Sequence, residues 1–383
     1  MCAFFDLYIT QSLLPRLQLE FDVGVAAVSL TVFVATLAVA CAAPLAGGLA
    51  DRFGRRRVLL SSIALLTVAT FGGATAHGLP QLLAWRAAQG LAVPGVFTSM
   101  AAYIAEEWPA AEAATVAGLY VAGTVLGGFC GRFISGIVTA WFGWRWAFLT
   151  LGLLNLACLP LVAWLLPPSR RFVPVDSLLA SLSGVRRHLR NRPLLATYGI
   201  GFALLFSQVG CFTYVNFYLS APPFGLSLHA LSFVFCVFLV GIVVTPVSGA
   251  WSMRWGARKV GMAAMAMSAA GLLLTLRPLL PQIIVGLTLS SSGVFIVQSL
   301  ATAKVPRLAH GARSAAVGLY VSCYYFGGSG GASLPSAIWS QAGWLGCVAL
   351  LVTVQLIGIA LISFAWRAPG VVALLETPMR TDV

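Results

Sequence analysis

Charged residues are scarce in this chain: only 9% of its 383 residues are Asp, Glu, Lys or Arg. By contrast, 60% are hydrophobic and the mean hydropathy is +0.94. A soluble protein of this length could not cover its surface with so few charges, so most of the chain must face lipid. The apolar runs also lack the short alternating pattern of a membrane barrel, and a backbone in hydrocarbon must satisfy its own hydrogen bonds. The composition therefore predicts an all-α membrane protein.

Several missing features exclude classes of function. The chain has two lysines, Lys259 and Lys304, and neither follows the glycine that a phosphate-binding loop requires, which argues against ATP as the energy source. Its four histidines are far apart, and its eight cysteines occur one at a time within apolar segments. One G-x-S-x-G run, at 327–331, lies in an apolar helical segment and not at a strand-to-helix elbow. We therefore expect no cofactor, no metal site and no enzymatic activity.

The distribution of positive charge argues against a nucleic-acid partner. The net charge is +13, but eighteen of the twenty-three Lys and Arg fall in alternate loops, in the central linker or in the tail. Only Arg16, Arg145 and Arg277 lie at the opposite face, while Arg86 and Arg132 lie inside apolar runs. Because positive charge is retained on the cytoplasmic side of a membrane, this asymmetry places both termini in the cytoplasm.

Apolar runs, bounded by charged residues and by Gly/Pro breaks, predict twelve membrane spans. We divide the chain into a six-helix half at 1–166, a cytoplasmic linker at 167–193, a second six-helix half at 194–366 and a cytoplasmic tail at 367–383. The linker carries six arginines and, over 178–190, the pattern of an amphipathic surface helix. The expected spans lie near 1–17, 25–49, 58–77, 80–105, 114–140, 144–166, 194–220, 229–252, 259–276, 281–303, 314–340 and 343–366.

The two halves repeat one another in sequence. The motif Gly118-Leu-Tyr-Val121 recurs 200 residues later as Gly318-Leu-Tyr-Val321, and the run from Pro44 to Val58 has its counterpart from Pro246 to Val260. Because each half holds an even number of spans, the halves have the same orientation, and we expect a solute path between them. Glycines that favour close helix packing recur at the same offset, namely Gly127, Gly128, Gly131, Gly327, Gly328 and Gly331.

The loop after the second span carries the most specific motif, Gly47-Gly-Leu-Ala-Asp51-Arg52-Phe-Gly54-Arg55-Arg56-Arg57. It resembles the signature loop of the major facilitator superfamily, G-x-x-x-D-R-x-G-R-R. The resemblance implies the twelve-helix major facilitator fold and secondary transport across a bacterial inner membrane. It also implies a conformational latch between the halves, with Asp51 near the start of the eleventh span. The latch candidates are Gly47, Asp51, Arg52, Gly54, Arg55 and Arg56.

A topology signal alone is the alternative reading of this loop. Asp51 opposes the local sign of charge, however, and Met253 takes its place in the second copy. A charge that serves only to hold the loop in the cytoplasm would not need an acid there. We therefore favour an asymmetric latch.

Further motifs resemble one branch of the superfamily. The run Arg86-Ala-Ala-Gln89-Gly90 resembles the R-x-x-Q-G motif of the fourth span, and Asp6-Leu-Tyr8 resembles the first span of drug:proton antiporters. The runs 128–136, 214–218 and 324–328 resemble the YnfM branch, the acriflavine-sensitivity transporters. One departure weighs against efflux by proton exchange: the fifth span lacks the Gly-Pro that ends the antiporter motif.

Asp6, Arg86 and Arg132 are the charged residues that the expected spans place well inside the membrane. Such residues cost at least about 2.5–3.5 kcal/mol at the bilayer centre, so we expect them to carry charge coupling or to be paired. At about 1.5 Å per residue, Asp6 and Arg132 lie at the same depth, with Arg86 nearer the outer mouth. The first and fifth spans are neighbours in the facilitator fold, so the resemblance implies an Asp6–Arg132 pair.

Two readings of this expected pair remain. In one, Asp6 takes and releases a proton, while an arginine stabilises the carboxylate or binds an anionic group of the substrate. In the other, the two residues form a fixed structural ion pair.

Aromatic and amide residues gather in the seventh and eleventh spans. In the facilitator fold the first, fourth, seventh and tenth spans line the cavity, so the resemblance implies an aromatic cavity with a few polar side chains. Packing between helices or against lipid is the alternative for any one of them. The cavity candidates are Tyr8, Gln11, Gln89, Phe206, Gln208, Tyr214, Asn216, Tyr218, Gln298, Tyr320 and Tyr324.

The leading hypothesis is a secondary transporter that exports a small amphipathic organic solute in exchange for protons. A uniporter or an importer of a specific metabolite would have the same fold and stays an alternative. A membrane sensor or scaffold without transport is an alternative of another class, which Asp6, Arg132 and the signature loop disfavour. The expected partners are the lipid bilayer, the solute and protons, with no nucleic acid, and we expect a monomer.

Overall fold

The computed structural model describes residues 2–167, 188–309 and 313–366, and every regular element in these ranges is a helix. Long apolar runs form helices because a helix satisfies its backbone hydrogen bonds within one segment. The N-terminal half contains α1 (Cys2–Leu7), α2 (Leu14–Glu20), α3 (Val25–Phe53), α4 (Arg55–Ala74), α5 (Leu79–Glu107), α6 (Ala110–Phe142) and α7 (Trp144–Leu165). The C-terminal half contains α10 (Arg192–Ser220), α11 (Leu228–Val234), η1 (Phe235–Leu239), α12 (Val240–Trp255), α13 (Ala257–Leu274), α14 (Leu280–Leu308) and α15 (Arg313–Ala365).

Ten helices among the described residues are long and apolar enough to cross a membrane. The longest, α15, covers two expected spans, and its backbone leaves the helical conformation at Gly343, where φ is 54° and ψ is −142°. A continuous first span over 1–17 is wrong, because α1 and α2 are separated by turns. The expected eighth span is interrupted by the 3-10 helix η1. The count of twelve spans stays a prediction.

Two further expectations fall partly or wholly outside the described residues. The amphipathic linker helix expected over 178–190 lies outside them as far as residue 187, and so does the whole tail at 367–383.

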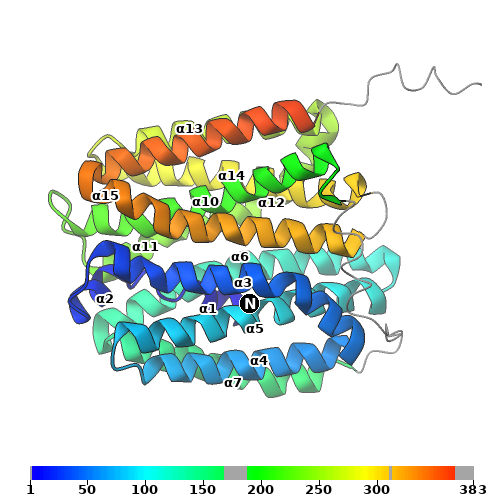
Figure 1. Ribbon diagram of the computed structural model, residues 1–383, viewed down its shortest axis with the longest axis horizontal. Helices are drawn as coiled ribbons and strands as arrows, with labels where there is room; N and C mark the ends of the chain where they lie inside the picture. Colours follow the sequence, from blue (N-terminus) through cyan, green and yellow to red (C-terminus); the bar gives the residue numbers. More distant parts are fainter. Residues whose placement is uncertain (1, 168–187, 310–312, 367–383) are drawn as a thin grey trace, which may run out of the picture.

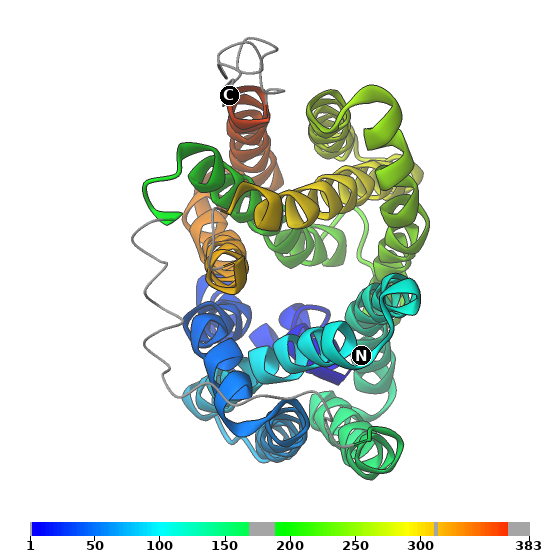
Figure 2. The ribbon, with the colours of Figure 1, turned by 90° about the vertical axis from the view of Figure 1, so that its right-hand side faces the viewer.

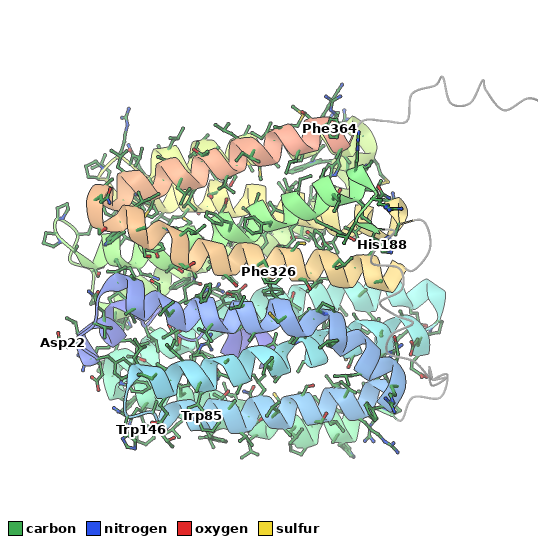
Figure 3. All side chains as sticks on the ribbon, viewed as in Figure 1. Asp22, Trp85, Trp146, His188, Phe326 and Phe364 are labelled. Atoms are coloured by element: carbon green, nitrogen blue, oxygen red, sulfur yellow. The ribbon has the colours of Figure 1, made fainter. Side chains whose placement is uncertain are left out.

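The helices run roughly along one direction and form two bundles, with the N-terminal half in the lower part of Figure 1 and the C-terminal half in the upper part. Figure 2 shows the same division seen along the helices. We call the end where α7 finishes and α10 begins the linker end; His188 and Phe364 lie there (Figure 3). Asp22 and Trp146 lie at the other end, which we call the opposite end.

Basic residues gather at the linker end, as the loop count predicts. Arg55 begins α4, Arg258 and Lys259 lie in the first turn of α13, and Arg307 lies in the last turn of α14. The opposite end carries Arg145 at the start of α7. The one-sided charge is therefore a property of the folded bundle, while a cytoplasmic position of the linker end stays a prediction.

The internal duplication is visible in how helices cross. Gly131 of α6 packs against the backbone of Phe5 in α1, and Gly331 of α15 packs against the backbone of Phe206 in α10. A Cβ atom at either glycine would overlap a carbonyl oxygen of the crossing helix. The packing role of these two glycines is confirmed, and the halves share this crossing.

Gly331→Ala is expected to destabilise the protein, because the new Cβ would push α10 away from α15. Overpacking of this kind typically costs about 1–3 kcal/mol. Gly318→Ala on the same helix is the control, since its nearest neighbour, the Cα of Pro44, would lie 3.8 Å from the new Cβ. Alanine there should be neutral or stabilise by up to about 1 kcal/mol. Equal melting temperatures for the two purified variants would contradict the crossing geometry.

Candidate functional site

The site is built around the break in the first span, between Leu7 and Leu14. Pro15 contributes to the break, because proline has no N–H to donate to the carbonyl of Gln11, four residues earlier. Inside a membrane a carbonyl freed in this way needs another donor. Asn216 of α10 provides it, with its Nδ2 at 2.8 Å from the Gln11 oxygen. A side chain of the C-terminal half thus completes the first span of the N-terminal half.

Five further carbonyls at the break also have donors. Arg86 of α5 donates from Nη1 to the Asp6 oxygen at 2.6 Å and from Nη2 to the Leu7 oxygen at 2.5 Å. Ser135 of α6 donates to the Ile9 oxygen at 3.1 Å. The carbonyls of Tyr8 and Thr10 accept from backbone N–H groups three residues later, each at 3.0 Å. Arg86 is fully buried and anchors the break beside Asp6, while its expected place nearer the outer mouth stays a prediction.

Asp6 is fully buried, and two neutral donors hold its carboxylate. Thr70 of α4 donates to Oδ1 at 2.7 Å, and Asn155 of α7 donates to Oδ2 at 2.6 Å. Gln89 of α5 donates to the Thr70 hydroxyl at 2.8 Å and accepts from Arg86. A chain of hydrogen bonds therefore runs from the carboxylate to the guanidinium, which we call the Asp6 network.

The expected Asp6–Arg132 pair is wrong. The ion pairs of the described residues involve neither side chain, and the Asp6 carboxylate is bound by α4 and α7. Depth arithmetic gives the height of a residue in the membrane, but not its direction around the helix. The break in the first span changes that direction, so that Gln11 reaches Arg132 instead.

Arg132 lies between the two halves, with 2% of its surface exposed. Its Nε donates to Oε1 of Gln11 at 2.7 Å, and its Nη1 donates to the Gly128 oxygen at 2.6 Å. The guanidinium carbon lies 3.9 Å from the ring centroid of Tyr8 and 4.4 Å from that of Phe238. Tyr8 comes from the first span and Phe238 from η1, so both halves surround this cation.

Polar side chains join the two halves, and one of them is Gln11, the partner of Arg132. Nε2 of Gln11 lies 3.2 Å from the Val209 oxygen and 3.1 Å from the Thr213 hydroxyl, both in α10. The hydroxyls of Thr36 in α3 and Ser329 in α15 lie 3.0 Å apart. The contacts of Gln11 lie in the part of α10 that is farther from its linker end.

Three cavity candidates in α10 make packing contacts with the C-terminal half, and Tyr214 also interacts with Ser29 of α3. Tyr214 donates to a carbonyl of α15 at 2.8 Å, and Tyr218 stacks on Trp344 with ring centroids 5.5 Å apart. Phe206 is buried beneath the crossing at Gly331. These contacts match the packing alternative for the three residues.

Four further candidates belong to the network or to the interface between the halves. Gln89 belongs to the Asp6 network, whereas Tyr8, Gln11 and Asn216 lie between the halves.

In the C-terminal half, Tyr320 and Tyr324 stack with centroids 6.1 Å apart, and Tyr324 lies within electrostatic range of Arg132. Gln298 lies beside the Tyr324 phenol, and Gln208 donates to a serine of α14 at 3.4 Å.

Sequence reasoning missed several residues that hold the site together. Neutral Thr, Ser and Asn are common in apolar spans, so they gave no signal of their own. Pro15 was the available signal, because it frees the Gln11 carbonyl inside the membrane. The missed residues are Thr70, Ser135, Asn155, Thr213, Phe235 and Phe238.

The signature loop joins helices of the N-terminal half to one another. Asp51 forms an ion pair with Arg55, whose Nη2 lies 2.7 Å from Oε1 of Glu106 in α5. Arg56 donates to two carbonyl oxygens at the end of α7, at 2.9 and 2.6 Å. Residues 310–312, just before α15, lie outside the described ranges. A contact between Asp51 and the start of the eleventh span therefore stays a prediction.

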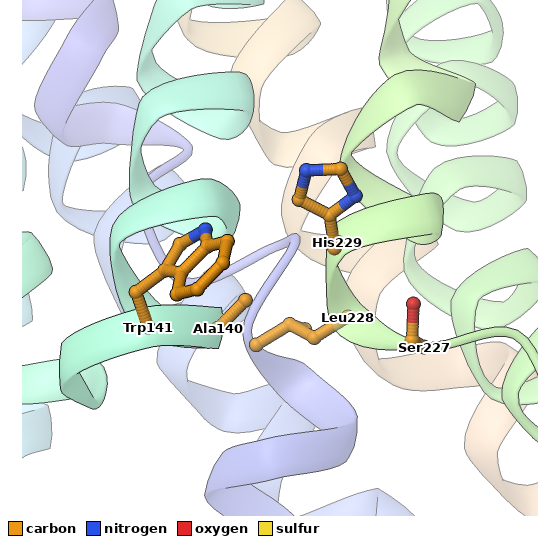
Figure 4. Close-up of a pocket in the computed structure, with 5 residues that line it drawn as sticks. All are labelled: Ala140, Trp141, Ser227, Leu228 and His229. Atoms are coloured by element: carbon orange, nitrogen blue, oxygen red, sulfur yellow. The ribbon is translucent and has the colours of Figure 1, made fainter.

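A cavity of about 330 Å³ lies between the halves at the opposite end of the bundle (Figure 4). Neither Asp6 nor Arg132 lines it, so it marks the boundary between the halves and not the polar site. The lining residues, from the end of α6 and the start of α11, are Ala140, Trp141, Ser227, Leu228 and His229.

Two duplicated helical halves that meet around buried polar side chains define a multi-pass membrane transporter. The chain belongs to the Major Facilitator Superfamily, whose family model matches residues 1–244. It is 31% identical over 367 residues to the uncharacterized MFS-type transporter YybF of Bacillus subtilis, covering 96% of this chain and 91% of YybF. It is also 31% identical over 361 residues to the inner membrane transport protein YnfM of Escherichia coli, covering 93% and 87%.

A solved structure supports the fold. The crystal structure of a bacterial homologue of the human lysosomal transporter Spinster, in an inward-facing and unoccupied conformation, matches with a TM-score of 0.76. The match covers 96% of each chain at 14% sequence identity.

Asp6→Asn and Arg132→Gln should lower stability additively, because the two side chains share no partner. Independent sites usually add within about 0.3–0.5 kcal/mol, whereas directly bonded residues couple by about 0.5–3 kcal/mol. Asp6→Asn combined with Thr70→Val is the positive control for coupling. Melting temperatures of the single and double variants test this. If the double Asp6/Arg132 variant is more stable than either single variant, the two side chains do form an ion pair and the contacts described here are contradicted.

Proposed function

We propose that the chain is a secondary active transporter that exports a small amphipathic organic solute by alternating access, in exchange for protons at Asp6. The observation that carries the proposal is a fully buried carboxylate, held by neutral donors, next to the interface between two duplicated halves. Intramembrane acids of this kind are typical of proton relays. We also propose that the protein lies in a bacterial inner membrane as a monomer, with its linker end on the cytoplasmic side.

Asn155 supports proton exchange because it can serve both states of Asp6. Its Nδ2 donates to the carboxylate, while its Oδ1 is buried and has no hydrogen-bond partner among the described residues. Rotation of the amide by half a turn would present that oxygen to a protonated Asp6. The carboxyl group of Asp6 then has a hydrogen-bond partner on Asn155 in each protonation state, which avoids the cost of leaving it unpaired.

The arrangement of contacts between the halves supports alternating access. Gln11 bonds to α10 away from the linker end, where η1 also meets α6 through Arg132. These contacts favour a state closed toward the opposite end. Exposure of the site to that end would require the Gln11 contacts to break, which is a rocking of one half against the other.

Two partial relatives support an organic solute with an aromatic body. The gallate transporter of Pseudomonas putida is 29% identical over 184 residues, which is 47% of this chain. The quinidine resistance protein 1 of Saccharomyces cerevisiae is 28% identical over 208 residues, which is 52% of this chain. Gallate is a carboxylate and quinidine an amine, so these names leave the charge of the solute open.

Asp6→Asn should abolish solute-driven proton movement while the protein stays folded, because a side-chain amide does not take up and release a proton near neutral pH. Solute exchange without a proton gradient should persist. Everted vesicles with a pH-sensitive dye, challenged with a panel of aromatic acids and amines, report the proton movement.

Asp22→Asn is the matched control for this variant. Asp22 is exposed in a loop at the opposite end with φ of 48°, a conformation that asparagine tolerates. It removes the same charge without touching the Asp6 network. Undiminished proton movement in Asp6→Asn would show that the carboxylate is not the coupling site.

Asp51→Asn should lower the transport rate several-fold with little change in melting temperature, because Arg55 keeps its ion pair with Glu106. Rate loss with a stable fold is what a conformational latch requires, since the latch acts on the transition between states. Lys259→Gln, an exposed charge change at the same end of the bundle, is the control. Unchanged turnover in Asp51→Asn would leave the loop as a topology signal alone.

A further inference from the structure

Arg132 is a buried cation without an anionic partner. Among the described residues its guanidinium makes two hydrogen bonds, to the Gln11 side chain and to the Gly128 oxygen, and both acceptors are neutral. Asp6, the acid inside the spans, is occupied by Thr70 and Asn155. A guanidinium has five N–H donors, so three of them, including both on Nη2, have no partner in the described part of the chain.

Aromatic rings surround the same guanidinium. The ring centroids of Tyr8, Phe238 and Phe235 lie 3.9, 4.4 and 5.7 Å from its central carbon. Ring faces partly compensate a buried cation, but they accept no conventional hydrogen bond from the free N–H groups. The surroundings therefore offer an apolar, aromatic wall next to unused donors arranged in a planar fork, which matches a carboxylate in geometry.

The duplication shows that helix packing does not require this arginine. Gly131 and Gly331 occupy equivalent crossings, yet the residue after Gly331 is Ala332, which is fully buried. The C-terminal half thus builds the same crossing with a methyl group. The guanidinium of Arg132, at the equivalent position of the N-terminal half, is therefore not explained by helix packing.

Two interruptions of helical geometry meet at Arg132. Tyr8 and Gln11 belong to the broken segment of the first span, and Phe235 and Phe238 belong to η1. Irregular backbone at membrane depth is tolerated where it is buried in protein or lines a binding site. Because η1 comes from the C-terminal half, movement of that half would change the aromatic wall around the cation.

We propose that Arg132 and the rings of Tyr8, Phe235 and Phe238 form the binding site for the carboxylate of an aromatic organic anion. This inference rests on the proposed transport function and names its substrate class. The carboxylate accepts from the free N–H groups of Arg132, and the aromatic body packs against rings from both halves. Amines and neutral amides of the same shape are rejected, because they offer the guanidinium no anionic acceptor.

Ligands that share one shape and differ in charge test the proposal on the purified wild-type protein. Benzoate should raise the melting temperature, whereas benzamide and benzamidine should not. Cyclohexanecarboxylate and acetate separate the contribution of the ring from that of the carboxylate, and we expect benzoate to bind most tightly and acetate least. Stabilisation by benzamidine equal to that by benzoate, or no response to benzoate, would overturn the proposal without any variant.

Arg132→Gln should weaken the binding of radiolabelled benzoate by about 10- to 100-fold, the range typical of hydrogen bonds to a charged group. Arg132→Lys keeps the charge but loses the fork, so its affinity should fall less. Arg145→Gln, at an arginine that stacks on Trp144 at the opposite end, is the matched control and should bind normally. A purely structural arginine predicts lower stability in Arg132→Gln with unchanged benzoate affinity.

Failure of this inference can be told apart from failure of the proposed function. Benzoate binding that depends on Arg132, without movement of any solute in vesicles, would contradict transport and keep the site. Transport that selects amines and persists in Arg132→Lys would keep transport and overturn the site. If Arg132→Gln does not fold, the charge series on the wild type and the Arg132→Lys affinity decide the question.

Discussion

The absence of water inside a membrane is the constraint on which this structure depends. The first span is broken before Pro15, so several backbone carbonyls lose their helical donors. The replacements come from Arg86 of α5, Ser135 of α6 and Asn216 of α10. A local break thereby ties together three other helices and both halves. The buried polar side chains of the site are in large part the groups that the break requires.

The same constraint separates the two buried charges that lie near the break. Asp6 is held on the side of α4 and α7, whereas Arg132 meets Gln11 at the boundary between the halves. In the proposed mechanism this separation assigns proton exchange to Asp6 and solute binding to Arg132. In a direct ion pair, the Asp6 carboxylate and the Arg132 guanidinium would have bound each other. Neither would then have been available to a proton or to a solute.

The duplication provides a symmetric frame in which the charges are placed asymmetrically. The crossings at Gly131 and Gly331 are equivalent, but Ala332 stands where the N-terminal half has Arg132. Met253 likewise stands where that half has Asp51. The N-terminal half therefore holds the buried charges and the acid of the signature loop, and the C-terminal half contributes aromatic rings and amides. When one half moves against the other, a charge held by the N-terminal half meets different side chains of the C-terminal half.

The sequence by itself determined the class of the protein. Hydropathy and charge asymmetry specified a helical membrane bundle with one basic end, because lipid allows few alternatives. The repeat identified equivalent helices, and the signature loop identified the superfamily. The sequence also singled out Asp6, Arg86 and Arg132, since charged residues inside apolar runs are rare.

Only the tertiary structure decided which partners these charges have. Sequence spacing gives the depth of a residue in a straight helix, and the first span is not straight, so Asp6 turned toward Thr70 and Asn155. Neutral partners of this kind look like any other residue in an apolar run. Arg132 met Gln11, Tyr8 and η1 because the two halves dock there. Contacts between segments some 100–200 residues apart depend on how helices rotate and cross, which no local pattern encodes.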